Sequence, residues 1–317
     1  MPHISDEGLA GYRALRESVG RVNIDDSVFF ELTGADRVEW LQGQITQDLS
    51  GLTSGSSGQA CLCSPTGQLL ADLRIWAADD RLLIAVADSQ AESVERRVEM
   101  AVVLEDVELA RLTGPWYSVQ GPMADHWVAS RFGIDVAQTP GDVHRSDGVW
   151  ILRSDRVGGP GWDVVGHGGP SPEIPNVPDE AVRIASLEAG IPVPGVDTHA
   201  RTLPPELGSA FESSRISYRK GCYTGQEVLM RIHSRGHTNR TWSGLICEGP
   251  VASGDAVSHP SRPDAGTVTR SAWSPALGWI AGAELRNEAA NDGDTVEVRT
   301  GSGPVRAVVR RMPLRPM

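Results

Sequence analysis

The sequence changes character after Thr241, and this change limits the folds that the chain can adopt. From there to the C-terminus, turn-rich pieces separate short apolar runs, which read WSGLICE, GTVTRSAW, ALGWIAGAEL, DTVEVRT and VRAVVRR. Regular short strands with turns between them are typical of small β-barrels and β-sandwiches. We therefore expect a separate β-domain at the C-terminus.

The first 240 residues instead mix helix and strand patterns, without a regular βαβ alternation. Strand and helix patterns alternate in its first part, over residues 27–32, 34–49, 81–87 and 89–103. Between them, QACLCS and QLLADLRIW flank the turn sequence SPTG, which predicts a β-hairpin. Further strand patterns indicate a second mixed unit, over residues 107–112, 116–120 and 148–154.

The rest of the second unit contains two helix patterns and one interruption. Residues 179–190 have a helix pattern that ends at a glycine before a proline, and residues 224–234 form a second, shorter one. The Gly- and Pro-rich stretch 158–178 breaks the pattern, so we expect it to be a long connection.

Composition excludes several classes of protein. A chain of 317 residues is long enough for two or three domains. Its net charge of −12 argues against direct binding to nucleic acid, because binding to phosphates needs a basic surface. No apolar run approaches the roughly 20 residues that span a bilayer, and the polar N-terminus lacks the layout of a signal peptide. We expect a cytoplasmic protein with no membrane contact.

The cysteines and the absent motifs narrow the chemistry further. Cys61, Cys63, Cys222 and Cys247 form no CxxC pair, so the sequence predicts no zinc or other metal site. It also contains no Walker A sequence, no GxGxxG after a strand, no GxSxG and no HExxH. The commonest nucleotide-binding, hydrolase and zinc-protease classes are thereby removed.

One segment concentrates unusual residues. Of the 29 basic residues, 28 are arginine, and the one lysine of the chain is Lys220. A lysine kept in such a sequence indicates a position that needs a compact ammonium rather than a wide guanidinium. Lys220 lies two residues before Cys222, in a glycine-flanked basic loop that precedes a helix pattern, where a thiolate is favoured. The alternative is a tight turn with a small buried cysteine, followed by a helix whose first turn carries Glu227.

At this point the sequence resembles a known family. The octapeptide KGCYTGQE, residues 220–227, is similar to the signature of the YgfZ family, the folate-binding relatives of the glycine-cleavage T protein (GcvT). Three further stretches resemble the same family in the same order: WLQGQITQDL, SPTGQLLADL and GVDTHARTLPPE. The resemblance implies an α+β fold of three domains around a central channel. They are two mixed α/β domains, expected over residues 1–106 and 107–240, and a small β-barrel over residues 241–317.

The resemblance also implies a function and a set of site residues. It implies a tetrahydrofolate-binding protein, with folate or a one-carbon derivative as cofactor, that supports assembly or repair of iron–sulfur proteins, among them tRNA-modifying enzymes. Asp72 matches the T-protein aspartate that orients the reacting folate nitrogen. The expected catalytic residues are Cys222, Lys220 and Asp72, with Lys220 stabilising the thiolate. The expected cofactor-binding residues are Asp72, Arg183, Tyr223, Gln226, Glu227 and Arg231.

Two departures from the family pattern leave alternatives open. The acid that grips the pterin in the T protein has Asp163 as its best counterpart, and the arginine expected before the helix end is replaced by Ser186, with Arg183 one turn earlier. The alternatives are a folate-dependent aminomethyl- or methyltransferase, and an RNA- or protein-binding scaffold without chemistry. A cluster carrier built from the four cysteines is a third, which their scattered spacing disfavours.

Overall fold

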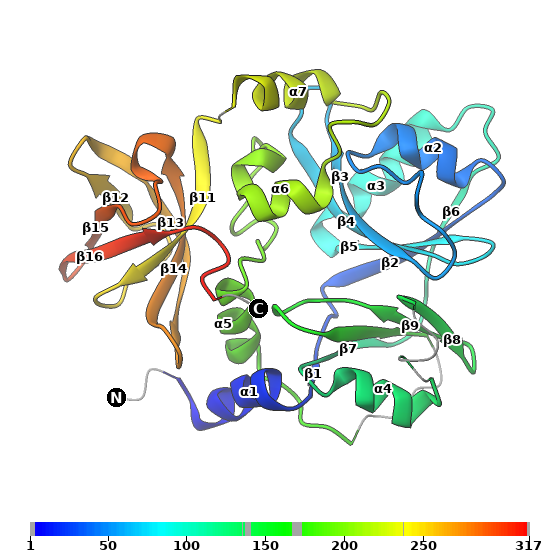
Figure 1. Cartoon of the computed structure of the whole chain (residues 1–317), viewed down its shortest axis with the longest axis horizontal. Coiled ribbons are helices and arrows are strands. Elements are labelled where there is room, and N and C mark those ends of the chain that lie inside the picture. The colour runs from blue at the N-terminus through cyan, green and yellow to red at the C-terminus, as the bar shows by residue number, and fades with distance from the viewer. Residues whose placement is uncertain (1–3, 135, 137–140, 167–172, 237, 316–317) are drawn as a thin grey trace.

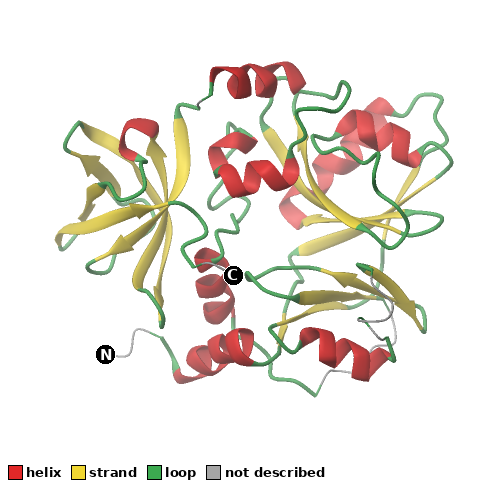
Figure 2. Ribbon diagram, viewed as in Figure 1, coloured by secondary structure: helices red, strands yellow, loops and turns green. Residues whose placement is uncertain are grey.

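The computed structural model describes residues 4–134, 136, 141–166, 173–236 and 238–315. Two mixed units and a β-barrel surround the centre of the molecule, to which the C-terminal segment returns (Figure 1). Helices and strands are both abundant, and the barrel consists almost wholly of strands (Figure 2). The expected fold class, two mixed α/β domains with a C-terminal β-barrel, is confirmed.

The first mixed unit is an antiparallel sheet with helices on one face. Its strands follow the order β3-β4-β5-β2-β6. Their bounds are Ser57–Cys63 for β3, Leu69–Ala77 for β4, Leu82–Ala87 for β5, Ser27–Thr33 for β2 and Glu108–Arg111 for β6. The covering helices are α2, Arg37–Gln44, and α3, Asp88–Ala101. Along β4, the buried residues Ala71, Leu73 and Ile75 alternate with Asp72 and Arg74, so that the two charged side chains share the opposite face.

The second mixed unit is also an antiparallel sheet, in the order β1-β7-β10-β9-β8. Its elements are β1 Gly20–Val22, β7 Trp116–Gln120, β8 Val143–Ser146, β9 Val149–Arg153, β10 Gly161–Val165 and the helix α4 Ala124–Phe132. The stretch 158–178, which the sequence predicts to hold a long connection, also contains strand β10, which pairs with both β7 and β9.

The sheets also divide the chain differently from the expected boundary at residue 106. Strand β6 follows that boundary but pairs with β2 in the first sheet. Strand β1 precedes the boundary by far but pairs with β7 in the second sheet. Each unit therefore takes one strand from beyond the expected boundary, since sheet pairing joins segments that are distant in the sequence.

Helices fill the space between the three units. They are α1 Asp6–Glu17, α5 Asp179–Glu188, α6 Ser209–Arg215 and α7 Gln226–Arg235, with a short 3-10 turn at Pro204–Leu207. At the end of α5, the buried Glu188 accepts hydrogen bonds from Tyr12 and Arg16 of α1 and from Ser274 of the barrel. The backbone N–H of Leu314 donates to the Glu188 carbonyl, 2.8 Å away. Glu188 thus joins α1 through its carboxylate, and the C-terminal segment through its backbone carbonyl, to the centre of the molecule.

The C-terminal domain is a closed barrel with the strand order β11-β14-β13-β12-β15-β16. The strands span Arg240–Cys247 for β11, Ala256–His259 for β12, Arg262–Ser274 for β13, Gly278–Arg286 for β14, Thr295–Thr300 for β15 and Gly303–Arg310 for β16, with a 3-10 turn at Asn287–Ala289. Closure leaves no unpaired sheet edge, and alternate apolar residues fill the interior. No helix in the described parts of the chain is long and apolar enough to cross a membrane.

Candidate functional site

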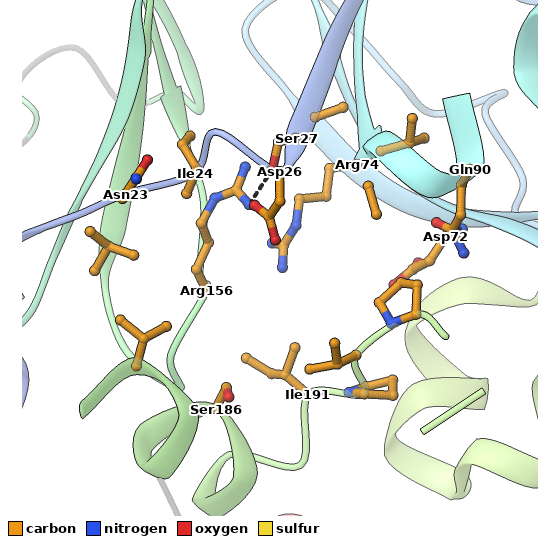
Figure 3. A pocket seen from close by; sticks show the side chains of 18 residues that line it. Asn23, Ile24, Asp26, Ser27, Asp72, Arg74, Gln90, Arg156, Ser186 and Ile191 are labelled. Carbon is orange, nitrogen blue, oxygen red and sulfur yellow. Dashed lines mark hydrogen bonds between the residues drawn. The ribbon is translucent and has the colours of Figure 1, made fainter. Parts of the chain in front are cut away.

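A pocket of about 190 Å³ lies where the first sheet, the second unit and α5 meet (Figure 3). Its polar lining comes from β4, from α5, from the start of α3, from the loop between β9 and β10, and from the first residue of β2 and the segment before it. Those polar side chains belong to Asn23, Asp26, Ser27, Asp72, Arg74, Gln90, Arg156 and Ser186. Its apolar wall includes Ile24, Val182 and the segment 191–194, which reads IPVP.

Asp72 lies at this pocket, on the face of β4 that points away from the helices. Its carboxylate accepts two hydrogen bonds from the Arg215 guanidinium, at 2.6 Å to Oδ1 and 3.1 Å to Oδ2. Arg215 ends α6 and is buried, with its guanidinium 4.1 Å from the ring centre of Phe211. The backbone N–H of Asp72 donates to Gln90, 3.2 Å away. Both carboxylate oxygens are therefore engaged before any ligand enters.

Two arginines project into the pocket from opposite sides (Figure 3). Arg156 is fixed by two parallel hydrogen bonds to the buried Asp163 of β10, 2.8 and 2.7 Å long. Arg74 makes one long hydrogen bond, 3.5 Å, to Ser154 Oγ. Burial and the neighbouring Arg156 lower the pKa of Arg74 to about 10, which still leaves it charged at neutral pH.

Asp163, the expected substitute for the pterin-binding acid, is absent from the lining of the pocket. Its whole side chain is buried, and it acts on the pocket by orienting Arg156. Ser186, which replaces the expected arginine, does line the pocket and accepts a hydrogen bond from Arg270 of the barrel, 3.1 Å away. Arg183 on the same helix is exposed and is not part of the lining.

The octapeptide follows the C-terminal end of α6 in the chain, and its residues do not belong to this lining. Lys220 is buried, and its ammonium donates to the carbonyl oxygens of Gln42, Ile45 and Gln47, at 2.6, 2.8 and 2.7 Å. Three acceptors around one nitrogen match the three N–H groups of an ammonium, which a planar guanidinium does not reproduce. Burial lowers the pKa of Lys220 to about 8, opposed by the Asp48 carboxylate. The requirement for lysine is therefore explained by backbone carbonyls, whereas its expected action on Cys222 stays a prediction.

The remaining octapeptide residues divide between the interior and the surface. Tyr223 is buried, with its ring centre 5.2 Å from the Lys220 ammonium, and burial raises the pKa of the Tyr223 hydroxyl. Cys222 is exposed at the start of the loop. Gln226, Glu227 and Arg231 belong to α7, and Gln226 donates weakly to the carbonyl of Gly221, 3.5 Å away. None of the five lines the pocket around Asp72, so their expected cofactor or catalytic roles also stay predictions.

Glycine is required at one position of this loop. Gly225 has a φ of 88°, and a Cβ there would lie 2.6 Å from the carbonyl oxygen of Ser64. Gly67, in the same turn between β3 and β4, faces Val228 of α7. The octapeptide is thereby packed against the hairpin that carries Asp72.

The other three cysteines lie in the interior of the protein. Cys61, Cys63 and Cys247 are buried, and burial raises the pKa of Cys63 and of Cys247 to about 12. In the described ranges, no three His, Cys, Asp or Glu side chains are placed to hold a metal ion.

The structure reveals three pocket residues that the sequence reasoning missed: Arg74, Gln90 and Arg156. Arg74 had a usable signal, because it follows Asp72 by two positions in a strand and must share its face. Arg156 and Gln90 had none, since they approach from other segments.

The fold and the pocket define a ligand-binding protein built on two mixed domains and a barrel, and comparison with known proteins identifies its family. The GCVT N-terminal domain model matches residues 4–143, and the glycine cleavage T-protein C-terminal barrel domain model matches residues 240–314. Together the two models match more than half of the chain. The protein belongs to the YgfZ/GcvT-like family.

Individual relatives agree with this assignment. The tRNA-modifying protein YgfZ of Yersinia enterocolitica is 27% identical over 234 residues, which cover 69% of this chain and 68% of that protein. The aminomethyltransferase of Frankia alni is 24% identical over 336 residues, covering 97% of this chain and 89% of that protein. The glycine cleavage system aminomethyltransferase T from Bartonella henselae has a similar fold, with a TM-score of 0.84 at 18% identity over 99% of this chain and 91% of that one.

Proposed function

We propose that this protein binds tetrahydrofolate, or a one-carbon derivative of it, in the pocket beside Asp72. We also propose that in this form it supports the assembly or repair of iron–sulfur enzymes, including tRNA-modifying ones. The observation that carries the proposal is that a carboxylate and a guanidinium, those of Asp72 and Arg74, lie on the same face of β4 and both line a largely apolar pocket. Membership of the YgfZ/GcvT-like family supports the same ligand.

The chemistry of the lining suits the parts of a reduced folate. A pterin is a flat ring system with several N–H donors, and it needs apolar walls and a few oriented acceptors. The segment 191–194 and Ile24 supply apolar surface, while Asp72 and Gln90 supply oxygen acceptors. The folate tail ends in carboxylates, which guanidinium groups bind at two points.

The hydrogen bonds of Asp72 suit a binding role. Both oxygens of Asp72 accept hydrogen bonds from Arg215, which hold the carboxylate in one orientation. A carboxylate has about four lone-pair positions, so the remaining ones can accept hydrogen bonds from a ligand. We therefore assign Asp72 to orienting the bound ligand.

A folate-dependent aminomethyltransferase is the second candidate. The match to the Frankia alni aminomethyltransferase along 97% of this chain favours it. It requires that the protein, given tetrahydrofolate and an aminomethyl donor, produce methylenetetrahydrofolate catalytically. Our proposal expects no such turnover, and repeated turnover would replace it with this second candidate.

Cys222 is the proposed point of contact with an iron–sulfur client. Its thiol is exposed on a loop that Lys220 and Gly225 hold against the first unit. An exposed thiol in a rigid loop is accessible to a large partner, whereas the pocket beside Asp72 admits only a small molecule. We assign the two sites to different ligands on this basis.

The binding part of the proposal is tested by anaerobic calorimetric titration with tetrahydrofolate. We expect a dissociation constant in the micromolar range, and no binding by the wild-type protein would remove the folate proposal. The cellular part is tested by deleting the gene and measuring iron–sulfur enzyme activities. We expect these activities to fall and to recover with the wild-type gene but not with Cys222→Ala; normal activities in the deletion strain would refute the maintenance role.

A further inference from the structure

The charges around the pocket are not balanced. Asp72 is neutralised by Arg215, and Arg156 is neutralised by Asp163. Arg74 has no ion pair within 4.0 Å among the residues that the structure describes. The other lining acid, Asp26, is exposed and forms no ion pair with Arg74 within that distance. Of the three arginines around the pocket, Arg74 is therefore the one without a direct carboxylate partner among the described residues.

The position of Arg74 makes this charge costly without a ligand. Arg74 is partly buried and lines the pocket, with its guanidinium directed into the cavity (Figure 3). A buried charge is normally paired, because removing it from water costs far more than a weak hydrogen bond returns. Its hydrogen bond to Ser154, at 3.5 Å, is near the limit of such contacts. Among the described residues, most of its five N–H donors thus have no acceptor at hydrogen-bonding distance.

The neighbouring arginines strengthen this argument. Burial lowers the pKa of Arg74 to about 10; repulsion by Arg156 and Arg215 adds to this effect, and attraction to Asp163 and Asp72 opposes it. Both carboxylates are bound at two points by the other two arginines, Asp163 by Arg156 and Asp72 by Arg215. An anion entering the pocket therefore meets Arg74 as its available partner.

We propose that Arg74 binds a carboxylate of the ligand and so selects ligands that carry an acid group. This inference rests on the proposed folate function and deepens it, because it assigns the carboxylates of the folate tail to a particular residue. A guanidinium binds a carboxylate through two parallel hydrogen bonds, which adds direction to the attraction. The apolar segment 191–194 then lies beside the uncharged part of the ligand.

The test separates the two ends of the folate molecule. p-Aminobenzoylglutamate has the carboxylates and no pterin, and 6-methyltetrahydropterin has the pterin and no carboxylate. NMR-monitored titrations without oxygen measure the binding of these two probes and of tetrahydrofolate to the wild type and to Arg74→Gln. We expect the variant to bind tetrahydrofolate and p-aminobenzoylglutamate about 10- to 100-fold more weakly, the loss typical of a charge-assisted hydrogen-bond pair. Its affinity for 6-methyltetrahydropterin should not change.

A matched control separates the local contact from the net charge. Arg96→Gln removes a guanidinium on α3 whose side chain is 64% exposed and does not line the pocket. This variant should bind all three probes as the wild type does. Thermal unfolding of both variants confirms that each is folded. Equal weakening of all three probes by Arg74→Gln, or no weakening of any, overturns the inference.

Failure of the folate proposal gives a different result. If the wild type binds p-aminobenzoylglutamate through Arg74 but does not bind tetrahydrofolate, the carboxylate site stands and the folate function falls. If the wild type binds none of the three probes, both fall.

Discussion

Arg215 and Asp72 join the pocket to the segment that leads into the octapeptide. The guanidinium Nε lies 2.6 Å from Oδ1 of Asp72, and Nη2 lies 3.1 Å from Oδ2. Asp72 belongs to β4 of the first sheet, and Arg215 is the last residue of α6, five positions before Lys220. A ligand that changes the contacts of Asp72 therefore acts on the same chain segment that holds the octapeptide.

Asp72→Asn should destabilise the protein by about 2–3 kcal/mol. The variant leaves the buried Arg215 without a negative partner, which is the costly way to break a buried ion pair. Urea denaturation gives the free energy of unfolding. The double variant Asp72→Asn with Arg215→Gln should recover part of the loss, and Glu92→Gln, in a highly exposed ion pair, should leave the value unchanged. Additive losses in the double variant would show that the pair does not act as a unit.

The segment 42–47 is held by the same stretch of chain. The hydroxyl of Thr46 donates to the Arg215 carbonyl, 2.6 Å away, and the N–H of Ser217 donates to the Thr46 carbonyl, 3.0 Å away. Lys220 then binds the carbonyls of Gln42, Ile45 and Gln47. Lys220 thus completes a continuous connection from the pocket to the loop of Cys222.

Lys220→Arg should lower the free energy of unfolding by about 2–4 kcal/mol, although it keeps the charge. A guanidinium is too wide and too flat to serve three converging carbonyls, and each buried acceptor left without a donor costs about 1–3 kcal/mol. Urea denaturation measures the change. The neighbouring exposed residue gives the control, since Arg219→Gln should have no effect. A Lys220→Arg variant as stable as the wild type would show that the three carbonyls do not require an ammonium.

The two glycines of the octapeptide should respond differently to alanine. Gly225→Ala forces a Cβ to within 2.6 Å of a backbone oxygen at a positive φ, so we expect a loss of more than about 1 kcal/mol in the free energy of unfolding. Gly221→Ala meets no atom within 4 Å and should be tolerated. Equal losses in the two variants would contradict the close packing of the loop against the hairpin of β3 and β4.

Cys222 should be the one cysteine that iodoacetamide modifies in the native protein. The structure describes all four cysteines, and the other three are buried. Their raised pKa values also leave little thiolate at pH 8. Mass spectrometry should find one modified site in the native protein and four after denaturation. Rapid native modification of Cys61, Cys63 or Cys247 would mean that their surroundings open readily.

The sequence predicted the barrel well because alternation and turns are local signals. The prediction was less accurate where tertiary contacts determine the secondary structure, as at the end of α2 and at β10. The expected helix 34–49 is α2, Arg37–Gln44, since the chain leaves the helix at Ile45 to bridge Leu62 and to place Thr46 against Cys61. Strand β10 was missed because its glycines and flanking prolines suggested a connection, although every residue of the strand is buried.

The candidate site was predictable only in part, for a related reason. Asp72 was predicted from the family resemblance. Strand alternation would also have predicted Arg74, which shares the face of Asp72, but the sequence analysis did not include it. The composition singled out Lys220 as a position that needs an ammonium, and this need stays a prediction. Its partners are backbone carbonyls, which no sequence pattern reveals. The sequence therefore suggested a different role for Lys220, the stabilisation of the Cys222 thiolate. Arg156 and Gln90 reach the pocket from distant segments that no local pattern connects.

The measurement that tests the central claim most directly is a crystal structure of the protein with tetrahydrofolate, grown without oxygen. The account predicts ligand density in the pocket between β4, α5 and residues 191–194, with a carboxylate within hydrogen-bonding distance of Arg74. Density at another place on the molecule, with this pocket unchanged, would contradict the assignment of the site.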